Sequence, residues 1–456
     1  MPLSAVSRLF GTNGIRGVVG TTIDSDFAHD IGLSVASLFE RSWVVVGRDG
    51  RTSSPMLIEG VVAGVLAHGN NVEDCGMITT PGLQFLVKHS SDRAGVMVTA
   101  SHNPPEYNGF KVIDRDGIEI SRRDEVKVER RFANRSASRN RKPGQRTYPV
   151  APLEPYLLSL QTYVSEKRMR DWFTVVVDVG NGVAALTTPE LLRRIGCRVV
   201  TINDNIDGRF PGRMSEPRPE NLGPLAAVVK QEGASFGVAH DGDGDRAIFV
   251  DETGMIHSGD KSLTLIEDEV LKKNPGASVV TPVNTSMSVA EVAKKRRGKL
   301  ILTPVGSINV ARTMVQEKAI LGGEENGGIF YAPHQPVRDG AMATVLILNS
   351  ILDNGLPLSR LMGRLPNFFM TKEKQACPDQ KKNNVMRNLR RRLGNKVTNT
   401  MDGVRVDLKG RGWFLVRASG TEPLIRIYFE GKTETDVKGL QEEFGPLFDQ
   451  IIRGGS

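Results

Sequence analysis

Short valine-rich runs alternate with longer segments of helical periodicity through most of the chain, and this alternation constrains the fold more than any other feature. Such runs occupy residues 43–46, 96–98, 174–177 and 278–280. Strands of a parallel sheet covered by helices on both faces are rich in valine without polar interruption. The pattern therefore predicts an α/β fold with mixed, mostly parallel sheets.

One inter-strand segment has clear helix signals at both ends. Ser54 and Pro55 precede a helical pattern over residues 56–68, and Gly69 follows it. Serine is a common N-cap, proline fits the first helical position, and glycine commonly ends a helix. We expect a helix over residues 56–68 that is capped by Ser54.

The alternation of strand and helix restarts near residues 174 and 278, which predicts three α/β domains of ordinary size. The last part of the chain differs, because three short strand patterns lie between helical stretches. That order is typical of a smaller α+β domain. We expect four domains, at residues 1–150, 151–254, 255–367 and 368–456.

Composition argues against several classes of protein. No apolar run approaches the ~20 residues that a membrane-spanning helix needs. The first ten residues lack the charged start and apolar core of a secretory signal. Cys75, Cys197 and Cys377 are too few and too scattered for a disulfide framework or a zinc site. We therefore expect a cytoplasmic protein with reduced thiols.

The net charge of +8 favours anionic partners, either nucleic acid or a phosphorylated metabolite. Much of the excess lies in residues 122–146, which lack an apolar period and are predicted to form a solvated connection. A second basic stretch, residues 381–392, has Met386, Leu389 and Leu393 at helical spacing. It predicts an amphipathic helix with a solvated basic face. Neither stretch interleaves aromatic residues as single-strand binders do, so we expect no nucleic-acid partner.

The first candidate functional loop, Thr-Ala-Ser-His-Asn-Pro-Pro at residues 99–105, follows a predicted strand. Open α/β sheets bind ligands beyond the carboxyl ends of their strands. The Asn-Pro-Pro turn is expected to leave Ser101 presented rather than packed. A serine nucleophile needs activation or prior phosphorylation, and His102 and Lys111 are candidates to move a proton or balance phosphate charge. A polar turn with an incidental histidine is the alternative that this loop alone leaves open.

The second loop alternates aspartate with glycine, so that the carboxylates of Asp241, Asp243 and Asp245 can converge. Three oxygen donors suit Mg²⁺, which commonly also takes a phosphate oxygen. The spacing resembles an EF-hand, but Arg246 stands where that loop needs glycine, and a strand pattern precedes it. A magnesium site is therefore favoured over an EF-hand or a surface acidic turn.

The charge of this loop requires cations nearby. Three carboxylates and one Mg²⁺ sum to minus one, so a phosphate dianion needs further positive charge. Arg246, Lys111 and Arg16 are the candidates, and Arg16 lies in a glycine-rich opening segment. Metal ions and Arg or Lys side chains are the usual stabilisers of a transferring phosphoryl group.

Two further loops are weaker signals. Residues 322–328, Gly-Gly-Glu-Glu-Asn-Gly-Gly, would offer Glu324 and Asn326 to sugar hydroxyls from a flexible, exposed loop. Residues 417–423 combine an arginine, hydroxyls and an approachable glycine, which are the parts of a phosphate clamp. An ordinary glycine turn and a polar β-turn are the respective alternatives.

Taken together and in this order, the segments resemble the α-D-phosphohexomutase superfamily, whose members include phosphoglucomutase/phosphomannomutase and phosphoglucosamine mutase. The resemblance extends from Leu9 to Tyr428, and residues 99–105 and 241–246 are its most specific motifs. It implies three similar α/β domains and a smaller C-terminal α+β domain around a central cleft.

The resemblance also implies a role for each loop. Ser101 would be a phosphoserine that shares Mg²⁺ with the three aspartates. The groups around the transferred phosphoryl group would be Arg246, His102, Lys111 and Arg16, with Lys111 and His102 as proton carriers. The sugar would be contacted by Gly306, Glu324 and Asn326. The second phosphate would be bound by Arg417, Ser419, Gly420 and Thr421, with Arg426 as a further candidate.

The implied reaction interconverts hexose 6-phosphate and hexose 1-phosphate in two half-steps. Phosphoserine first phosphorylates the sugar monophosphate, and the hexose 1,6-bisphosphate then returns its other phosphoryl group to Ser101 without escaping. The same bisphosphate would act as the activator. A hinge near residues 365–372 is expected to let the last domain open and close.

Two other functions remain to be weighed. A metal-dependent sugar-phosphate phosphatase would use the first two loops but has no need of the fourth. A basic nucleic-acid-binding protein would need none of them. Many bacterial relatives have Ser and His where this chain has Asn326 and Gly328, so the preference among glucose, mannose and glucosamine stays open. No sequence feature decides between a monomer and a homodimer.

Overall fold

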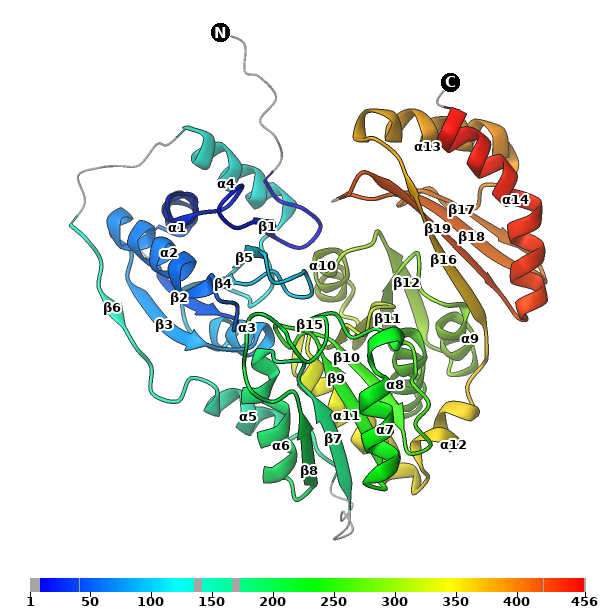
Figure 1. Ribbon diagram of the computed structural model, residues 1–456, viewed down its shortest axis with the longest axis horizontal. Helices are drawn as coiled ribbons and strands as arrows, with labels where there is room; N and C mark the ends of the chain where they lie inside the picture. The colour runs from blue at the N-terminus through cyan, green and yellow to red at the C-terminus, as the bar shows by residue number, and fades with distance from the viewer. Residues whose placement is uncertain (1–8, 41, 135–141, 166–172, 421, 455–456) are drawn as a thin grey trace.

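The structure is a computed structural model in which residues 9–40, 42–134, 142–165, 173–420 and 422–454 are described. Its strands form four separate sheets, and we name the units built on them domains I to IV in chain order. Domains II and III lie side by side below domains I and IV in Figure 1. The limits between the domains stay a prediction.

Domain I is built on a six-stranded sheet of order β1-β5-β4-β2-β3-β6. Its strands are β1 (Ile15–Val18), β2 (Trp43–Arg48), β3 (Val72–Met77), β4 (Arg93–Val98), β5 (Tyr107–Ile113) and β6 (Arg146–Thr147). Its helices are α1 (Ser25–Leu38), α2 (Ser54–His68), α3 (Thr80–Lys88) and α4 (Arg122–Asn134). β4 pairs with β5 antiparallel, with Met97 opposite Lys111, and this pairing brings Lys111 to the loop that follows β4.

Domain II has a four-stranded sheet of order β10-β9-β7-β8. Its elements are α5 (Glu154–Gln161), β7 (Thr174–Asp178), α6 (Thr188–Arg194), β8 (Arg198–Ile202), α7 (Gly223–Gln231), β9 (Phe236–His240) and β10 (Ala247–Asp251). β9 and β10 form an antiparallel hairpin in which His240 lies opposite Ala247. The aspartate loop is the connection of this hairpin, so its two ends are fixed by a buried sheet.

Domain III has a five-stranded sheet of order β12-β11-β13-β14-β15. Its strands are β11 (Ser278–Pro282), β12 (Lys299–Thr303), β13 (Leu321–Gly323), β14 (Ile329–Tyr331) and β15 (Gln335–Arg338). Its helices are α8 (Gly259–Lys273), α9 (Met287–Lys295), α10 (Ser307–Glu317), α11 (Gly340–Asn354) and α12 (Leu358–Gly363). In the first three sheets the central strands are parallel and antiparallel strands stand at one side, as the predicted fold class requires.

Domain IV is an antiparallel sheet of order β16-β19-β18-β17 with two helices on one face. Its elements are β16 (Phe369–Ala376), α13 (Asp379–Leu393), β17 (Val404–Leu408), β18 (Gly412–Ala418), β19 (Leu424–Gly431) and α14 (Glu434–Gly454). α13 is the predicted amphipathic helix, with Val385 and Leu389 buried and Arg390 exposed. The expectation of a C-terminal α+β domain is confirmed.

Two local predictions need correction. Residues 122–134 are not a solvated connection but helix α4, because Val128 is buried in the domain I core and Phe132 packs on Phe27 with ring centroids 4.8 Å apart. Helix α2 does end at Gly69, which has a φ of 95°. Its first residue is Ser54, however, and the Ser54 hydroxyl donates to Asp49 Oδ1 at 2.6 Å instead of capping the helix.

The domain contacts differ in character. Domains II and III share one large apolar core, in which Phe236 and Val177 of domain II belong to the same cluster as Leu263 and Ile347 of domain III. Domain IV contacts domain III through a smaller cluster around Trp413. Domains II and III thus form a common base for the other two. Within the described residues, no helix combines the length and apolar character needed to cross a bilayer.

Candidate active site

The loop after β4 holds Ser101 against the aspartate loop of domain II. The Ser101 hydroxyl donates to Asp241 Oδ2 at 2.7 Å, so the two most specific sequence motifs meet directly. Ser101 has a φ of 51°, and its amide donates to Thr99 Oγ1 at 2.8 Å. The expectation that Ser101 is presented was wrong, since it is fully buried. Ser215 and Gly242 of domain II cover it, and a Cβ on Gly242 would lie 2.7 Å from the Ser101 carbonyl oxygen.

Arg51 holds the main chain of this loop in place through hydrogen bonds to its carbonyl oxygens. Its guanidinium donates to the carbonyl oxygens of Ser101 (2.8 Å), Asn103 (2.7 Å), Pro104 (2.6 Å) and Tyr107 (2.9 Å). Its Nε donates to Asp49 Oδ2 at 3.1 Å, and both side chains are buried. Only arginine offers so many donors in a fixed plane. Arg51 therefore holds the loop shape without touching the Ser101 hydroxyl.

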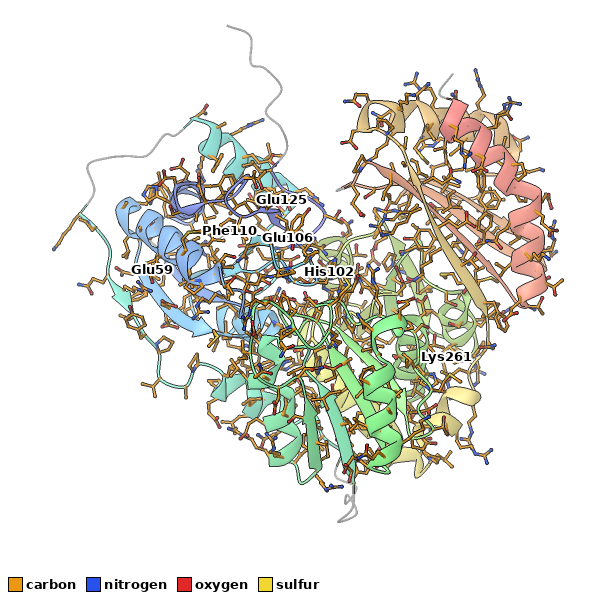
Figure 2. The ribbon with its side chains drawn as sticks, viewed as in Figure 1. Glu59, His102, Glu106, Phe110, Glu125 and Lys261 are labelled. Carbon is orange, nitrogen blue, oxygen red and sulfur yellow. The ribbon has the colours of Figure 1, made fainter. Side chains whose placement is uncertain are left out.

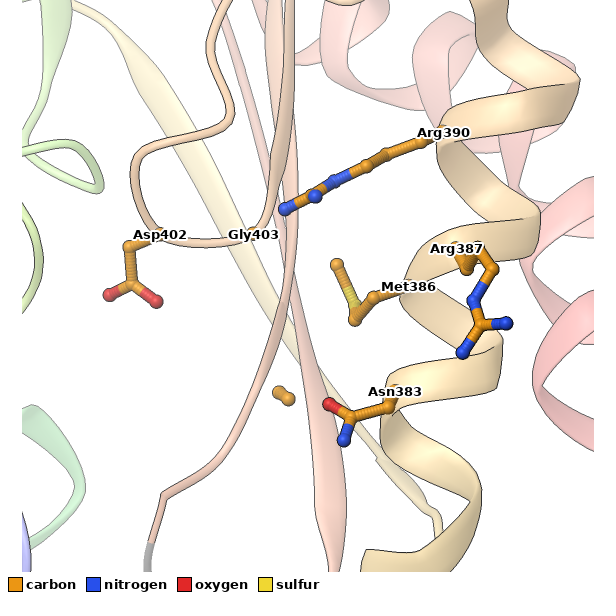
Figure 3. A pocket seen from close by; sticks show the side chains of 7 residues that line it. Asn383, Met386, Arg387, Arg390, Asp402 and Gly403 are labelled. Atoms are coloured by element: carbon orange, nitrogen blue, oxygen red, sulfur yellow. The ribbon is translucent and has the colours of Figure 1, made fainter.

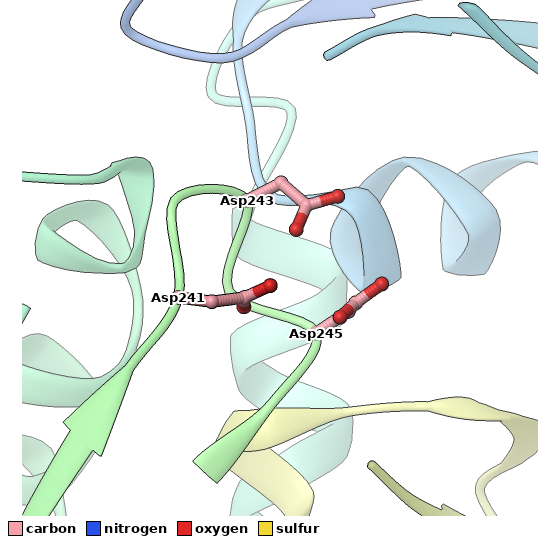
Figure 4. Close-up of side chains that lie close together, drawn as sticks. All are labelled: Asp241, Asp243 and Asp245. Carbon is pink, nitrogen blue, oxygen red and sulfur yellow. The ribbon is translucent and has the colours of Figure 1, made fainter. Parts of the chain in front are cut away.

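The three aspartates of the second loop converge on one point. Figure 4 shows Asp241, Asp243 and Asp245 projecting from the loop between β9 and β10 toward a common region. One carboxylate oxygen of each lies within 4.8 Å of the others, and all three side chains are buried. This is the hard-oxygen arrangement that the sequence predicted.

Cations of the protein offset part of this negative charge. Lys111 Nζ donates to Asp243 Oδ2 at 2.7 Å and to Asp245 Oδ2 at 2.8 Å. Arg338 also donates to Asp245 Oδ2, at 2.6 Å. Burial by itself lowers the pKa of Lys111, but the charges of Asp243 and Asp245 outweigh it and raise the pKa above its ordinary value. Lys111 is thus protonated in this arrangement.

The carboxylates keep unused capacity for a further cation. Burial, together with the charges of Asp245 and Asp243, raises the pKa of Asp241 above its ordinary value. Asp243 Oδ1 and Asp245 Oδ1 are buried and have no hydrogen-bond partner among the described residues. Leaving such atoms unsatisfied costs about 1–3 kcal/mol each. A divalent cation among the three oxygens relieves both the repulsion and the missing contacts, so the residues fit Mg²⁺.

The remaining predicted catalytic side chains contact the serine loop or the aspartates. His102 lies near the centre of the molecule in Figure 2, and its Nδ1 accepts from Arg246 Nη2 at 2.9 Å. Burial and the positive charge of Arg246 hold the pKa of His102 well below its ordinary value. Arg16 donates to Asn103 Oδ1 at 2.6 Å, while its Nη2 is buried without a partner among the described residues. The predicted set of Ser101, His102, Lys111, Arg246 and Arg16 is therefore brought together.

The predicted sugar loop joins the site through a residue that the sequence did not indicate. Glu324 is not on an exposed loop but is buried in the β13–β14 hairpin, where Arg338 Nη1 donates to it at 3.3 Å. Arg338 also holds Asp245, so it links this loop to the aspartates. Asn326 accepts from the Gly328 amide of its own loop at 3.1 Å.

Glycines of domains III and IV approach the opening segment of domain I. Gly306 has a φ of 131°, and a Cβ placed on it would lie 3.0 Å from Thr12 Cγ2. A Cβ on Gly420 would lie 3.5 Å from Thr12 Oγ1. The predicted sugar and phosphate loops thus both approach Thr12 of domain I.

The predicted phosphate clamp is organised by a second unpredicted residue. Asp402 Oδ2 accepts from Arg417 Nη2 at 3.0 Å and from Arg417 Nε at 3.2 Å. The same oxygen accepts from the amide of Val305, next to Gly306, at 2.9 Å. One carboxylate oxygen therefore joins the clamp arginine of domain IV to the predicted sugar loop of domain III.

The other clamp residues bond mainly within domain IV. Ser419 Oγ accepts from the Glu422 amide at 3.2 Å, and Arg426 pairs with Glu422. Lys382 of α13 donates to the carbonyl oxygens of Ser419 and Glu422, both at 2.6 Å. Thr421 lies outside the described residues.

Sequence reasoning missed Arg51, Arg338 and Asp402. The signal for Arg51 was present, since it follows a valine-rich strand in Gly-Arg-Asp-Gly-Arg, at the end of the sheet where ligands bind. Arg338 likewise ends a strand, just before the helix α11 that Asp339 caps. Asp402 lies in a turn with no distinguishing pattern, and only its contacts single it out.

Family models match nearly the whole chain. The models of the phosphoglucomutase/phosphomannomutase α/β/α domains I, II and III match residues 7–139, 154–254 and 258–369. The model of the phosphoglucomutase/phosphomannomutase C-terminal domain matches residues 373–445.

Whole-chain comparisons agree. A phosphoglucomutase/phosphomannomutase of Thermococcus kodakarensis is 38% identical over 98% of this chain and 100% of its own length. A phosphoglucosamine/phosphogalactosamine mutase of Sulfurisphaera tokodaii is 38% identical over 97% of this chain and 100% of its own length. The crystal structure of a phosphoglucomutase/phosphomannomutase family protein from Burkholderia thailandensis has a TM-score of 0.88 at 30% identity, and covers 97% of each chain. The chain therefore belongs to the phosphoglucomutase/phosphomannomutase family of phosphohexomutases.

Proposed function

We propose that the chain is a magnesium-dependent phosphohexomutase that interconverts hexose 6-phosphate and hexose 1-phosphate through a phosphorylated Ser101. The observation that carries this proposal is the 2.7 Å contact between the Ser101 hydroxyl and Asp241, within a buried group of three aspartates. The relatives are mutases, which favours this reaction over the phosphatase alternative.

Asp241, Asp243 and Asp245 would hold Mg²⁺, together with an oxygen of phosphorylated Ser101. The bound cation would neutralise charge on the phosphoryl group during transfer. The unsatisfied carboxylate oxygens support this assignment. An N-acetylphosphoglucosamine mutase of Aspergillus fumigatus, solved with GlcNAc-6P and magnesium, is similar in fold, with a TM-score of 0.64 at 15% identity.

In the first half-reaction a sugar hydroxyl oxygen bonds to phosphorus as the bond from phosphorus to Ser101 Oγ breaks. The hydroxyl proton passes to the protein while Ser101 Oγ takes up a proton; neutral His102 is the proposed acceptor and protonated Lys111 the proposed donor. Arg246 and Arg16 face the same group and stabilise its negative charge. The second half-reaction is the reverse transfer, from the other end of the bisphosphate to Ser101, so the same groups serve both.

The sugar and its second phosphate would be held from domains III and IV. Gly306, Glu324 and Asn326 are the proposed sugar contacts. Arg417, Ser419, Gly420 and Thr421, with Arg426, are the proposed phosphate contacts. Hexose 1,6-bisphosphate is the proposed activator, because it phosphorylates Ser101 when that residue has lost its phosphoryl group.

The partner that we propose is therefore a phosphosugar, with no nucleic-acid partner. A cytoplasmic location is part of the proposal and rests on the three scattered cysteines of the sequence. Relatives named for glucose, mannose and glucosamine phosphates are similarly close, so the preferred hexose is open, as is the choice between monomer and homodimer.

A substrate panel tests the proposal. The purified chain is incubated with the 1- and 6-phosphates of glucose, mannose and glucosamine, with Mg²⁺ and the matching bisphosphate, and both isomerisation and inorganic phosphate are measured. Isomerisation that stops when Mg²⁺ is chelated and returns when it is restored is expected. Intact-mass analysis should find one phosphate on a fraction of the chains, mapped to Ser101. Net release of inorganic phosphate without isomerisation would replace the mutase with the phosphatase.

A further inference from the structure

A pocket of about 320 Å³ lies in domain IV beside the proposed phosphate clamp. Figure 3 shows it between helix α13 and the turn that contains Asp402 and Gly403. Ala418, the residue between Arg417 and Ser419, also lines it. The pocket is thus separate from the clamp residues but shares a wall with them.

One face of α13 supplies the charged wall. Asn383, Arg387 and Arg390 line the pocket, and their spacing of four and three residues puts them on one side of the helix. Arg387 and Arg390 are exposed, and neither forms an ion pair with another described residue. Two guanidinium groups with unused donors on one side of a pocket are suited to a phosphate group.

The opposite wall does not cancel this charge. Asp402 is the acidic residue of the pocket, and its carboxylate is already paired with Arg417 at 3.0 Å. The same helix also supports the clamp from the preceding turn, through the two bonds from Lys382 to Ser419 and Glu422. The pocket and the clamp are therefore linked through Asp402 on one side and through Lys382 of α13 on the other.

We propose that this pocket is a second phosphate site, which holds one phosphate of the sugar bisphosphate while the intermediate exchanges its two ends. The proposal rests on the proposed function. During the exchange the clamp releases one phosphate before it takes the other, and at that moment the bisphosphate is most easily lost. Arg387 and Arg390 retain the released phosphate next to the clamp, so the intermediate stays on the enzyme.

Retention is measured as bisphosphate release. Phosphorylated enzyme is mixed with the hexose monophosphate that turns over best, and free bisphosphate is quantified after rapid filtration. The variant Arg387→Ala/Arg390→Ala is expected to release roughly fivefold more bisphosphate per turnover, the scale of two exposed charge contacts. Its steady-state rate should consequently depend more strongly on added bisphosphate. The first transfer, measured in a single turnover, should keep its wild-type rate.

The matched control is Arg391→Ala/Arg392→Ala. It removes the same charge from exposed positions of the same helix that do not line the pocket. It should release bisphosphate as wild type does. Equal release by the two double variants, or a first transfer slowed only in the pocket variant, would overturn the proposal.

Direct measurement of bisphosphate binding tests the second phosphate site independently of the proposed mutase activity. In a Ser101→Ala background no phosphoryl group is transferred, and glucose 1,6-bisphosphate affinity can be measured by calorimetry. The pocket variant should bind the bisphosphate more weakly than the control variant does, whether or not the wild type has mutase activity. Inorganic phosphate, added as a competitor, should raise bisphosphate release in wild type and control only. If the pocket variant changes inorganic phosphate binding and nothing else, the site is a general anion site and the proposal fails.

Discussion

The two ends of the proposed substrate site are built differently. Around Ser101 the chain supplies its own fixed partners, since Arg51 bonds four carbonyl oxygens and the serine, Asp241 and Lys111 are all buried. Around Arg417, one oxygen of the partly exposed Asp402 connects two domains. A rigid, desolvated end favours phosphoryl transfer, which depends on positioning and electrostatics. A lightly connected end suits a phosphate that must be released in every cycle.

The largest expected effect comes from Ser101→Ala at the rigid end. It removes the oxygen that is proposed to carry the phosphoryl group, so turnover should fall by at least roughly 10³-fold. Alanine retains the Cβ, so the local backbone at a φ of 51° is expected to persist. Steady-state assays and thermal melting are the measurements. Ser37→Ala, on α1, is the control, and wild-type turnover of Ser101→Ala would remove the covalent mechanism.

Arg51→Lys should come next. Lysine cannot reach four carbonyl oxygens in one plane, so the serine loop shifts, and a displacement of about 1 Å costs on the order of 10²-fold in kcat. The KM should change little, because the proposed sugar contacts lie in other domains. Single-turnover kinetics and the phosphorylated fraction of Ser101 are the readouts.

The neighbouring Arg48→Lys is the matched control for Arg51. The Arg48 side chain donates to the Asp49 carbonyl oxygen, whereas the Arg51 side chain donates to four carbonyl oxygens of the serine loop and the strand after it. Its kcat should stay within about twofold of wild type. If both variants lose activity equally, the special role of Arg51 is wrong.

At the lightly connected end, Asp402→Ala should raise the KM roughly tenfold and leave kcat within about twofold, because it frees Arg417 and the Val305 amide without moving Ser101. Asp402→Asn keeps an acceptor oxygen and should be intermediate. Glu442→Ala, an exposed carboxylate of the same domain, is the control. A fall in kcat at unchanged KM would contradict the view that the Ser101 end governs phosphoryl transfer and the Arg417 end governs substrate binding.

The smallest effect on activity is expected for Glu267→Gln, which is remote from both ends. Burial, with a contribution from Asp268, raises the pKa of Glu267 from 4.5 to about 9. Between these values the folded protein keeps a proton that the unfolded chain loses, so this group's contribution to stability falls as pH rises. The slope is at most about 1.4 kcal/mol per pH unit.

Glutamine removes that pH dependence. Melting temperatures measured from about pH 5 to pH 8 should show the advantage of Glu267→Gln over wild type growing with pH, with turnover unchanged. Glu269→Gln, which pairs with Lys272 on the same helix, is the control. Parallel melting curves for wild type and Glu267→Gln would show that Glu267 is ionised in the folded protein.

Strands and helices that a short stretch of sequence specifies could be predicted from that stretch alone. The valine-rich runs correspond to β2, β4, β7 and β11, and the apolar spacing in α13 is realised. Helix α4 was missed because its buried residues, such as Val128, are few among many charges. The meeting of Ser101 with Asp241 could be inferred only through the family resemblance, because the two residues are 140 positions apart.

The burial of Glu324 and the hydrogen-bond partners of Asp402 could not be predicted either, because both depend on residues that are distant in the sequence. Glu324 looked exposed in a glycine-rich sequence, but its environment is set by Arg338 from a later strand. Asp402 acquires its importance from Val305, 97 positions away. Such contacts depend on how domains pack, which periodicity and turn chemistry do not encode.

The way Arg51 holds the serine loop has a consequence for the catalytic cycle. Within this loop Arg51 bonds main-chain oxygens only, so none of these contacts involves the serine oxygen that would be esterified. In the proposed reaction that residue gains and loses a dianionic group in every turnover. Because the hydrogen bonds from Arg51 do not involve the serine side chain, the enzyme can alternate between its phosphorylated and unphosphorylated forms while the loop keeps its conformation.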